Sequence, residues 1–456
     1  MAKTAKKDST LTLEEKLEQA LVPNTEYPYK VPDNWCWVTI GTLVELLNGY
    51  AFKSAEYVDY GIRIIRITNV QDGYVEDEKP VFYPMNLTNE FEKYMLSEND
   101  LLISLTGNVG RVALLSADFL PAALNQRVGC LRIRKNAPLN IKFLFYCFLR
   151  KEFQDACIEN AKGSAQLNMS TEWLKEQAMP MPPLSEQQRI VDRIESLFAK
   201  LDEAKEKAQA VVDGYEDRKA AILHKAFTGE LTEKWRETRG LNLSDWRKMQ
   251  IRQIGEIITG STPSTANREY YGGSIPFVKP LELNQGRHVS FSENTLTEAG
   301  KAVSRPIRAG ATCICCIGAT ISKCGFLDVD SVTNQQINSI IPYEFMDDVF
   351  VYYYCCSKEF KDALIDNSSS TTLPIINKSK MSALSIVVPS KCEQIAISAI
   401  LDNAFSDEQN AKDAAEQVID HIETMKKSIL ARAFRGELGT NDPKDESAIE
   451  LLKSIL

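Results

Sequence analysis

The 456-residue sequence has only three histidines, no long hydrophobic run and no excess of positive charge. His224, His288 and His421 lie far apart, which argues against a histidine-dependent catalytic triad or a histidine-rich metal site. No segment approaches about eighteen consecutive apolar residues, so the sequence predicts no membrane span. The N-terminus is polar with no hydrophobic segment behind it, which predicts a cytoplasmic protein whose eleven cysteines are reduced.

The net charge of −9 gives little guidance to the partner, because it is unevenly distributed. Taken as a whole, it weakly disfavours nucleic acid. Residues 34–182 carry 15 basic and 17 acidic groups, residues 237–389 carry 15 of each, and residues 390–456 carry 8 and 13. Each of the two nearly neutral segments has enough cations to form a basic face.

The clearest pattern in the sequence is an internal repeat. Shifted by 207 residues, residues 182–231 align with residues 389–438 without a gap, and 19 of the 50 positions are identical. The sequence Ala-Phe-x-Gly-Glu-Leu ends both copies, and Pro-x-x-x-Glu-Gln begins both. A repeat of this kind predicts two similar structural units.

The repeated block predicts a long helix with a coiled-coil seam. Proline residues precede it, Ser185 is a plausible N-cap, and Gly229 and Gly436 supply the left-handed residue that ends a helix. Apolar residues alternate in steps of three and four, interrupted by Arg218 in the first copy and Glu408 in the second. The predicted seam residues are Ile190, Ile194, Leu197, Leu201, Val211 and Ile222, then Ile397, Leu401, Val418, Ile422 and Ile429. Two helices packed side by side and antiparallel explain the repeat best; two independent helical hairpins are the alternative.

The segments before the two helices also resemble each other, with short β-branched runs that predict strands at 62–67, 101–105, 128–133, 313–317 and 337–341. Helices are predicted near 139–160 and 348–367. The predicted fold class is α+β, with two mixed α/β domains joined by two long antiparallel coiled-coil helices in a pseudo-twofold repeat. The expected segments are a helical extension (1–33), a first domain (34–182), a first helix (183–231), a linker (232–244), a second domain (245–389), a second helix (390–438) and a tail (439–456).

Catalytic motifs are missing from the sequence. It has no Gly-x-x-x-x-Gly-Lys-Ser/Thr loop for a nucleoside triphosphate, no dinucleotide-binding glycine motif after a strand, and no Asn/Asp-Pro-Pro-aromatic motif of an amino-methyltransferase. Asp77-x-Lys79 resembles a nuclease fragment but lacks a partner carboxylate. Cys313, Cys315 and Cys316 suggest zinc, yet adjacent strand residues point to opposite faces, so buried thiols are the better interpretation.

Polar residues of the kind that read base edges and hold phosphates recur in loops of both domains. An ordinary solvated loop is the alternative for any single residue. The candidates are Arg66, Thr68, Asn69, Gln71, Asn108, Arg111, Asn125, Gln126 and Arg127 in the first domain, and Lys279, Asn284, Gln285, Arg287, His288, Thr320, Lys323, Asn334, Gln335 and Gln336 in the second.

The chain resembles the specificity subunits of type I restriction–modification systems over about residues 30–440. The two Pro-x-x-x-Glu-Gln helix entries and the two Ala-Phe-x-Gly-Glu-Leu ends carry the resemblance, with the segments that begin at Gly49 and Gly260 as openings of target-recognition domains. The loop Gly163–Asn168 also matches the family, whereas Ser368–Pro374 in the second copy departs from it. The resemblance adds Lys53, Ser164 and Gln166 to the candidate DNA contacts.

The resemblance implies a non-catalytic subunit in which each domain reads one half of a split DNA target and the helices set the spacer. It also implies two docked modification subunits that use S-adenosylmethionine to methylate adenine, and two restriction subunits that use ATP with Mg²⁺. This chain would itself bind no cofactor and no metal. A single-chain nuclease or methyltransferase and a purely structural scaffold remain the other hypotheses, and sequence-specific DNA binding would separate them.

Overall fold

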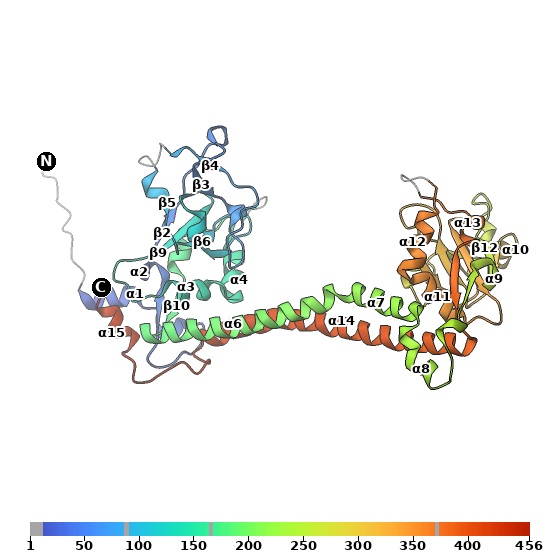
Figure 1. The fold of residues 1–456 in the computed structure, drawn as a ribbon. Coiled ribbons are helices and arrows are strands. Elements are labelled where there is room, and N and C mark those ends of the chain that lie inside the picture. The colour runs from blue at the N-terminus through green and yellow to red at the C-terminus, as the bar shows by residue number, and fades with distance from the viewer. Residues whose placement is uncertain (1–11, 86–90, 164–166, 370–373) are drawn as a thin grey trace. The chain divides into compact units, whose positions relative to one another are not determined.

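The computed structural model describes residues 12–85, 91–163, 167–369 and 374–456 of the chain. It divides into two compact units, which are described one at a time (Figure 1). Unit 1 comprises Met1–Lys207 and Val418–Leu456, and unit 2 comprises Ala208–Gln417. Each unit contains one of the predicted α/β domains and part of both long helices. Among the described residues, no helix is long and apolar enough to cross a membrane.

In its described residues, unit 1 contains three sheets, with the strand orders β2-β9-β6-β7, β4-β3-β8-β5 and β1-β10. All pairings are antiparallel except that of β3 with β8. The strands are β1 Cys36–Thr39, β2 Val44–Asn48, β3 Ile62–Ile65, β4 Phe82–Tyr83, β5 Met95–Leu96, β6 Leu101–Ser104, β7 Val112–Leu114, β8 Ala122–Leu124, β9 Val128–Ile133 and β10 Ala178–Met181.

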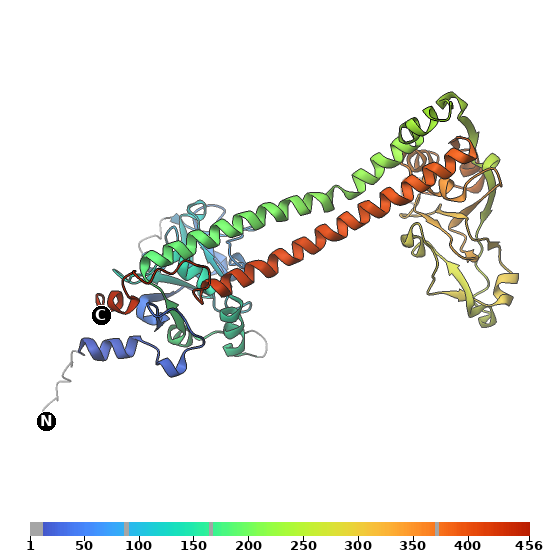
Figure 2. The same ribbon diagram turned by 90° about the horizontal axis from the view of Figure 1, so that it is seen from below.

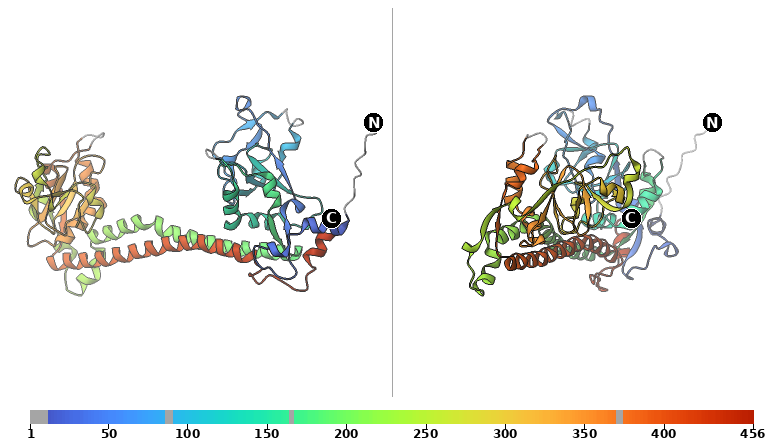
Figure 3. Two further views of the ribbon diagram at one scale, coloured as in Figure 1. Left: turned by 180° about the vertical axis from the view of Figure 1, so that it is seen from behind. Right: turned by 90° about the vertical axis from the view of Figure 1, so that its right-hand side faces the viewer.

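The helices of unit 1 include α1 and α15, which come from opposite ends of the described chain and pack together. The helices are α1 Leu13–Ala20, α2 Ile40–Leu43, α3 Ile141–Phe148, α4 Lys151–Asn160, α5 Thr171–Glu176, α6 Leu184–Asp213 and α15 Ala448–Lys453. In Figures 2 and 3, α15 lies beside α1, and Lys16 Nζ donates a hydrogen bond to the carbonyl oxygen of Leu456 at 2.5 Å. Ala448 and Leu452 are fully buried in the same hydrophobic cluster as Phe143. Helix α15 is therefore part of the unit 1 core.

Unit 2 repeats the sheets of unit 1 strand for strand, with orders β12-β19-β16-β17, β14-β13-β18-β15 and β11-β20. Its strands are β11 Arg247–Gln250, β12 Gly255–Thr259, β13 Tyr271–Val278, β14 Thr295–Leu296, β15 Pro306–Ile307, β16 Thr312–Cys315, β17 Cys324–Phe326, β18 Ser331–Thr333, β19 Ile337–Pro342 and β20 Ser385–Val388. Its helices are α7 Tyr215–Thr228, α8 Glu233–Glu237, α9 Ile251–Ile254, α10 Glu298–Ala302, α11 Asp348–Cys356, α12 Lys358–Asp366, α13 Lys378–Ser382 and α14 Lys391–Ala433, of which α14 continues into unit 1. The predicted internal repeat of mixed α/β domains is confirmed.

The long helices pack antiparallel within each unit. In unit 1, Lys205 of α6 pairs with Glu423 of α14 at 2.6 Å, and the ammonium of Lys426 lies 5.2 Å from the ring of Phe198. In unit 2, the ammonium of Lys219 lies 5.4 Å from the ring of Phe405. Since Lys219 and Phe198 are 207 residues before Lys426 and Phe405, the same cation–ring contact is made twice.

The two polar interruptions of the predicted seam pair with each other. Arg218 Nε donates to Glu408 Oε2 at 2.7 Å, and Arg218 Nη2 donates to the Val211 carbonyl at 2.8 Å. The second bond accompanies a break in the first helix at Gly214, which separates α6 from α7. The expectation of one unbroken helix over this block is therefore wrong for the first copy, where a side chain replaces a backbone partner, but correct for α14.

Five of the eleven predicted seam residues are buried, namely Ile190, Ile194, Ile397, Leu401 and Ile422. Leu197, Leu201, Val211, Ile222 and Ile429 are half-buried. Val418 is 44% exposed, because in this part of α14 the buried face consists of Ala415 and Ile422. Ser185 is the second residue of α6 rather than its cap. Gly229 and Gly436 have positive φ, as predicted.

A buried glutamate explains why Glu-Gln begins both long helices. Glu186, in the first turn of α6, accepts hydrogen bonds from Trp35 Nε1 at 2.7 Å and from Asn441 Nδ2 at 2.8 Å. Burial raises the pKa of Glu186 above its usual value, although these hydrogen bonds oppose the shift. The neighbouring Gln187 donates to the carbonyls of Pro138 and Pro182. Both side chains tie the start of the helix to its domain.

Unit 2 contains the same arrangement with a charged partner. Glu393 accepts hydrogen bonds from Trp246 Nε1 at 3.0 Å, from Arg236 Nη1 at 2.7 Å and from Thr232 Oγ1 at 2.8 Å. Arg236 is only 5% exposed, so this ion pair is buried. In both units, the glutamate that begins one long helix binds the segment that follows the end of the other.

Candidate nucleic-acid interface

The loop between β3 and β4 and its counterpart between β13 and β14 begin with the same capped turn. The Arg66 amide donates to Asn69 Oδ1 at 2.8 Å, and the Lys279 amide donates to Glu282 Oε2 at 2.9 Å. Asn69 is 4% exposed and also donates to Asp77 Oδ1. Asn69, predicted to contact DNA, is therefore a structural residue of the loop.

Glu282 was not found from the sequence, because its role is played by an amide in the first copy. It is 9% exposed and accepts a hydrogen bond from Ser292 Oγ at 3.2 Å. In unit 1, Asn69 donates a hydrogen bond to the carboxylate of Asp77. In unit 2 the direction is reversed, because the carboxylate belongs to Glu282 and the donor is Ser292. The sequence contained one signal for Glu282, which is that it occupies the same position in its loop as Asn69 does in the first copy.

A cation from the β6–β7 hairpin, and its counterpart in unit 2, braces the same loop. Arg111 Nη1 donates to Gln71 Oε1 at 2.6 Å, and Lys323 Nζ donates to Asn284 Oδ1 at 2.5 Å. The two cations occupy equivalent positions after β6 and β16, and so do the two amides. Gln71 Nε2 also donates to the Thr68 carbonyl at 3.0 Å, so both ends of this amide hold the loop.

A tight turn follows β8 and its counterpart β18. Asn125 Oδ1 accepts from the Arg127 amide at 3.3 Å, and Asn334 Oδ1 accepts from the Gln336 amide at 3.2 Å. Gln126, Arg127 and Gln335 are exposed at the turn. The asparagines thus shape the turn and the residues after them face outward.

Glycines that open the two domains allow these turns to form. A Cβ atom at Gly49 would lie 2.2 Å from the Asn125 carbonyl oxygen, and one at Gly260 would lie 2.2 Å from that of Asn334. We expect Gly260→Ala to lower the free energy of unfolding by about 1–3 kcal/mol, because the backbone must shift. Denaturant unfolding checks this, with the exposed Ser274→Ala as the control. An unchanged midpoint would contradict the close approach.

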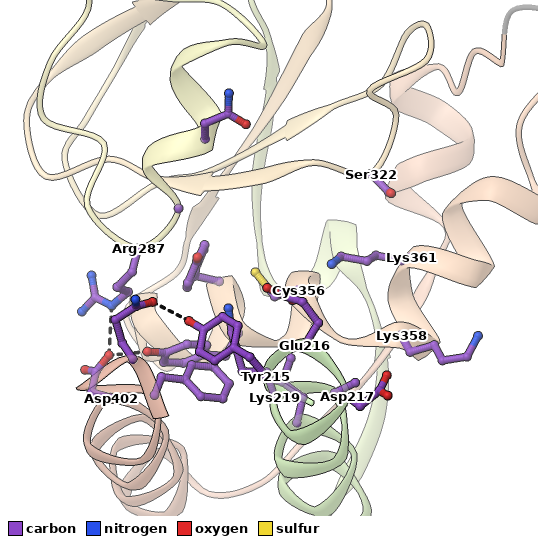
Figure 4. Close-up of a pocket in the computed structure, with 18 of the residues that line it drawn as sticks. Tyr215, Glu216, Asp217, Lys219, Arg287, Ser322, Cys356, Lys358, Lys361 and Asp402 are labelled. Atoms are coloured by element: carbon purple, nitrogen blue, oxygen red, sulfur yellow. Dashed lines mark hydrogen bonds and ion pairs between the residues drawn. The ribbon is translucent and has the colours of Figure 1, made fainter. Parts of the chain in front are cut away.

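Arg287 lines a cavity of about 1320 Å³ within unit 2, together with Asn284, Gln285 and His288 (Figure 4). Its Nε donates to Asp402 Oδ1 at 3.2 Å, and its guanidinium lies 4.4 Å from the ring centre of Phe326. The Tyr353 hydroxyl donates to the same carboxylate oxygen. Arg287 therefore fastens the β13–β14 loop to α14 rather than extending outward.

The remaining candidates differ in exposure, and Ser164 and Gln166 lie outside the described residues. The exposed candidates are Lys53, Thr68, Asn108, Asn284, Gln285, His288 and Thr320; Arg66, Lys279 and Gln336 are half-buried. Gln285 Nε2 donates to the Phe291 carbonyl at 2.7 Å, so it also stabilises its own loop. Apart from Lys53, which lies between β2 and β3, the described candidates of each unit lie in three neighbouring loops, and few of them are free of protein contacts.

Cys313 and Cys315 of β16, and Cys316 directly after it, are core residues. Cys315 and Cys316 belong to different hydrophobic clusters, in agreement with their predicted opposite orientation. Burial raises the pKa of both Cys313 and Cys316 to about 12, so these thiols stay protonated at neutral pH. Among the described residues, no group of three or more histidine, cysteine or acidic side chains is arranged to hold a metal ion.

A family model described as type I restriction modification DNA specificity domain matches residues 32–212 and residues 243–418. The two matches cover most of the chain, so the chain belongs to this family and contains its domain twice.

The relatives are specificity subunits. The type I restriction enzyme EcoBI specificity subunit of Escherichia coli is 23% identical over 429 residues, which are 90% of this chain and 87% of that one. The crystal structure of the HsdS subunit from Thermoanaerobacter tengcongensis has a TM-score of 0.63 at 20% identity, and covers 91% of this chain and 100% of its own. A structure described under complex assembly and conformational transition of the type I R-M system has a TM-score of 0.67 at 19% identity, with 90% and 100% coverage. The chain is thus a non-catalytic specificity subunit, since the enzymatic activities of these systems belong to other subunits.

Proposed function

We propose that each unit binds one half of a bipartite double-stranded DNA target. The observation that carries this proposal is that the same three loops are built twice with equivalent internal bonds, including Arg111 with Gln71 and Lys323 with Asn284. Two equivalent polar surfaces on one chain suit two half-sites. Side chains that differ between the units at equivalent loop positions would then read different bases.

The two long helices set the unread spacer between the half-sites and bind two modification subunits. Exposed apolar residues on α14 support this part of the proposal. Val418 and Met425 are 44% and 51% exposed and lie seven residues apart, so they occupy the same face of the helix. Helices of the modification subunits would cover this face.

The proposed complex is a cytoplasmic methyltransferase and ATP-dependent endonuclease. Its modification subunits bind S-adenosylmethionine and methylate adenine, and two restriction subunits use ATP with Mg²⁺. This chain contributes DNA recognition and binds neither cofactor.

Sequencing of methylated DNA from a host that expresses the chain with a type I modification subunit tests the proposal. We expect N6-methyladenine in both halves of one split motif. Replacing residues 245–389 by the corresponding domain of a relative should change one half and leave the other intact. If both proteins are soluble and associated but no new methylation appears, the chain is a scaffold rather than a reader of DNA.

A phosphate contact by Arg127 would give a distinct signature. We expect Arg127→Ala to weaken DNA binding about equally for all sequences and to reduce the slope of log affinity against log salt by about one. Fluorescence anisotropy over a salt series measures both quantities. Lys200→Ala, which removes an exposed cation from α6, is the control and should leave the slope unchanged. A change in the methylated motif with an unchanged slope would instead assign Arg127 to base readout.

A further inference from the structure

The first strands of the two domains, β1 and β11, occupy equivalent places but differ in how they are covered. Cys36 pairs with Met181 and Arg247 pairs with Val388, and each strand follows a tryptophan bound to the buried glutamate. All four residues of β1 are buried or half-buried, whereas in β11 the first two residues are exposed and the last two half-buried.

In unit 1, the N-terminal segment of the chain covers the outer edge of β1. The Val22 amide donates to the Trp37 carbonyl at 3.0 Å, and Leu21 forms an antiparallel bridge with Val38. The rings of Tyr27 and Tyr29 lie 5.9 Å and 4.9 Å from the ring of Trp37. One bridge and one backbone hydrogen bond from this segment therefore cover the outer edge of β1.

In unit 2, the same edge is open. Among the residues that the structure describes, β20 is the one strand that pairs with β11. A groove of about 670 Å³ adjoins this strand pair, and its apolar lining comes from Leu241, Trp246, Met249 of β11, Phe345 and Val388 of β20. Phe345 is 45% exposed. An unpaired strand edge next to an apolar groove is the geometry that accepts an added peptide strand.

The charges around this edge select an acidic partner. Arg247, Lys248 and Lys391 are exposed there. Of the two carboxylates that line the groove, Glu393 is buried and paired with Arg236, and Asp245 accepts a hydrogen bond from the Asn242 amide. A second copy of this chain, paired with this edge, would place its own cations opposite these cations, and the repulsion between like charges is unfavourable.

We propose that the open edge of β11 and the adjoining groove bind an extended acidic segment of a modification subunit. This inference rests on the proposed function, because it assigns a further contact to a partner named there. The segment adds as a strand to β11, at the edge that corresponds to the one residues 21 and 22 cover on β1, and places apolar side chains in the groove. DNA could meet the cations but offers neither a strand nor apolar side chains.

Hydrogen exchange of the full chain, alone and in complex with its modification subunits, tests the inference. We expect the amides of β11, above all that of Lys248, to exchange at least tenfold more slowly in the complex. The amides of β1 are an internal control, because their edge is already covered. Unchanged exchange of β11 in a complex that forms normally overturns the inference, and so does protection produced by DNA alone. A chain that forms no complex contradicts the proposed function as well.

Charge reversal at the edge provides a second measurement. We expect the double change Arg247→Glu with Lys248→Glu to weaken binding of one modification subunit at least tenfold, measured by native mass spectrometry over a titration. Both side chains are exposed, so the fold should persist. Lys135→Glu, an exposed change in unit 1, is the matched control. Equal affinities of the double variant and the control overturn the inference.

Discussion

Replacement of Glu393 by alanine is expected to lower the free energy of unfolding of unit 2 by about 3–5 kcal/mol. The change leaves the guanidinium of Arg236 buried without its carboxylate, and it removes the acceptor of Trp246 Nε1. Denaturant unfolding of the full chain, with hydrogen exchange to locate the effect in unit 2, measures the loss.

Two further variants show how much of the stability loss comes from leaving a buried charge without its partner. Glu186→Ala should cost less, about 1–3 kcal/mol, because Trp35 and Asn441 are neutral donors. Glu423→Ala should cost at most about 1 kcal/mol, because its pair with Lys205 is exposed. If Glu393→Ala cost no more than Glu423→Ala, the buried ion pair would not stabilise the unit.

A seven-residue insertion in both long helices is expected to lengthen the unread DNA spacer by about three base pairs. Seven residues add about 10.5 Å of helix and preserve the phase of the seam, and a base pair rises about 3.4 Å. Suitable positions follow Lys207 in α6 and Gln417 in α14. Methylated-DNA sequencing with the modification subunits reads the motif directly.

The two half-sites should stay the same in the inserted variant, because neither domain changes. A three-residue insertion is the control, since it moves apolar residues out of the seam and should reduce activity. If the half-sites changed while the spacer did not, the helices would not set the spacing.

The repeat and its domains could be predicted because they depend on periodic patterns. The 207-residue shift predicted both the matching helices and, through them, the matching domains. Local departures could not be predicted in this way. Arg218 and Glu408 each interrupt a seam when considered alone, and only their contact in the antiparallel pair at 2.7 Å shows that they compensate each other.

The candidate DNA contacts were predicted by residue type, which does not reveal burial. Asn69 and Asn334 are polar loop residues, yet they are 4% and 8% exposed and hold the backbone of their loops. Arg287 has the chemistry of a DNA contact, but Asp402, more than a hundred residues away in sequence, engages it. Contacts between loops decide which side chains remain free, and they are set by tertiary packing.

The buried glutamates also limit errors in helix register. Glu186 at the start of α6 binds Asn441 beyond the end of α14, and Glu393 at the start of α14 binds Arg236 beyond the end of α7. A coiled coil can in principle slide by one heptad and still pack its apolar seam. Here such a slip would separate the partners at both glutamates at once. Each glutamate therefore fixes the register of the two helices within its own unit against a slip of one heptad, which is a shift of about 10.5 Å along the helix.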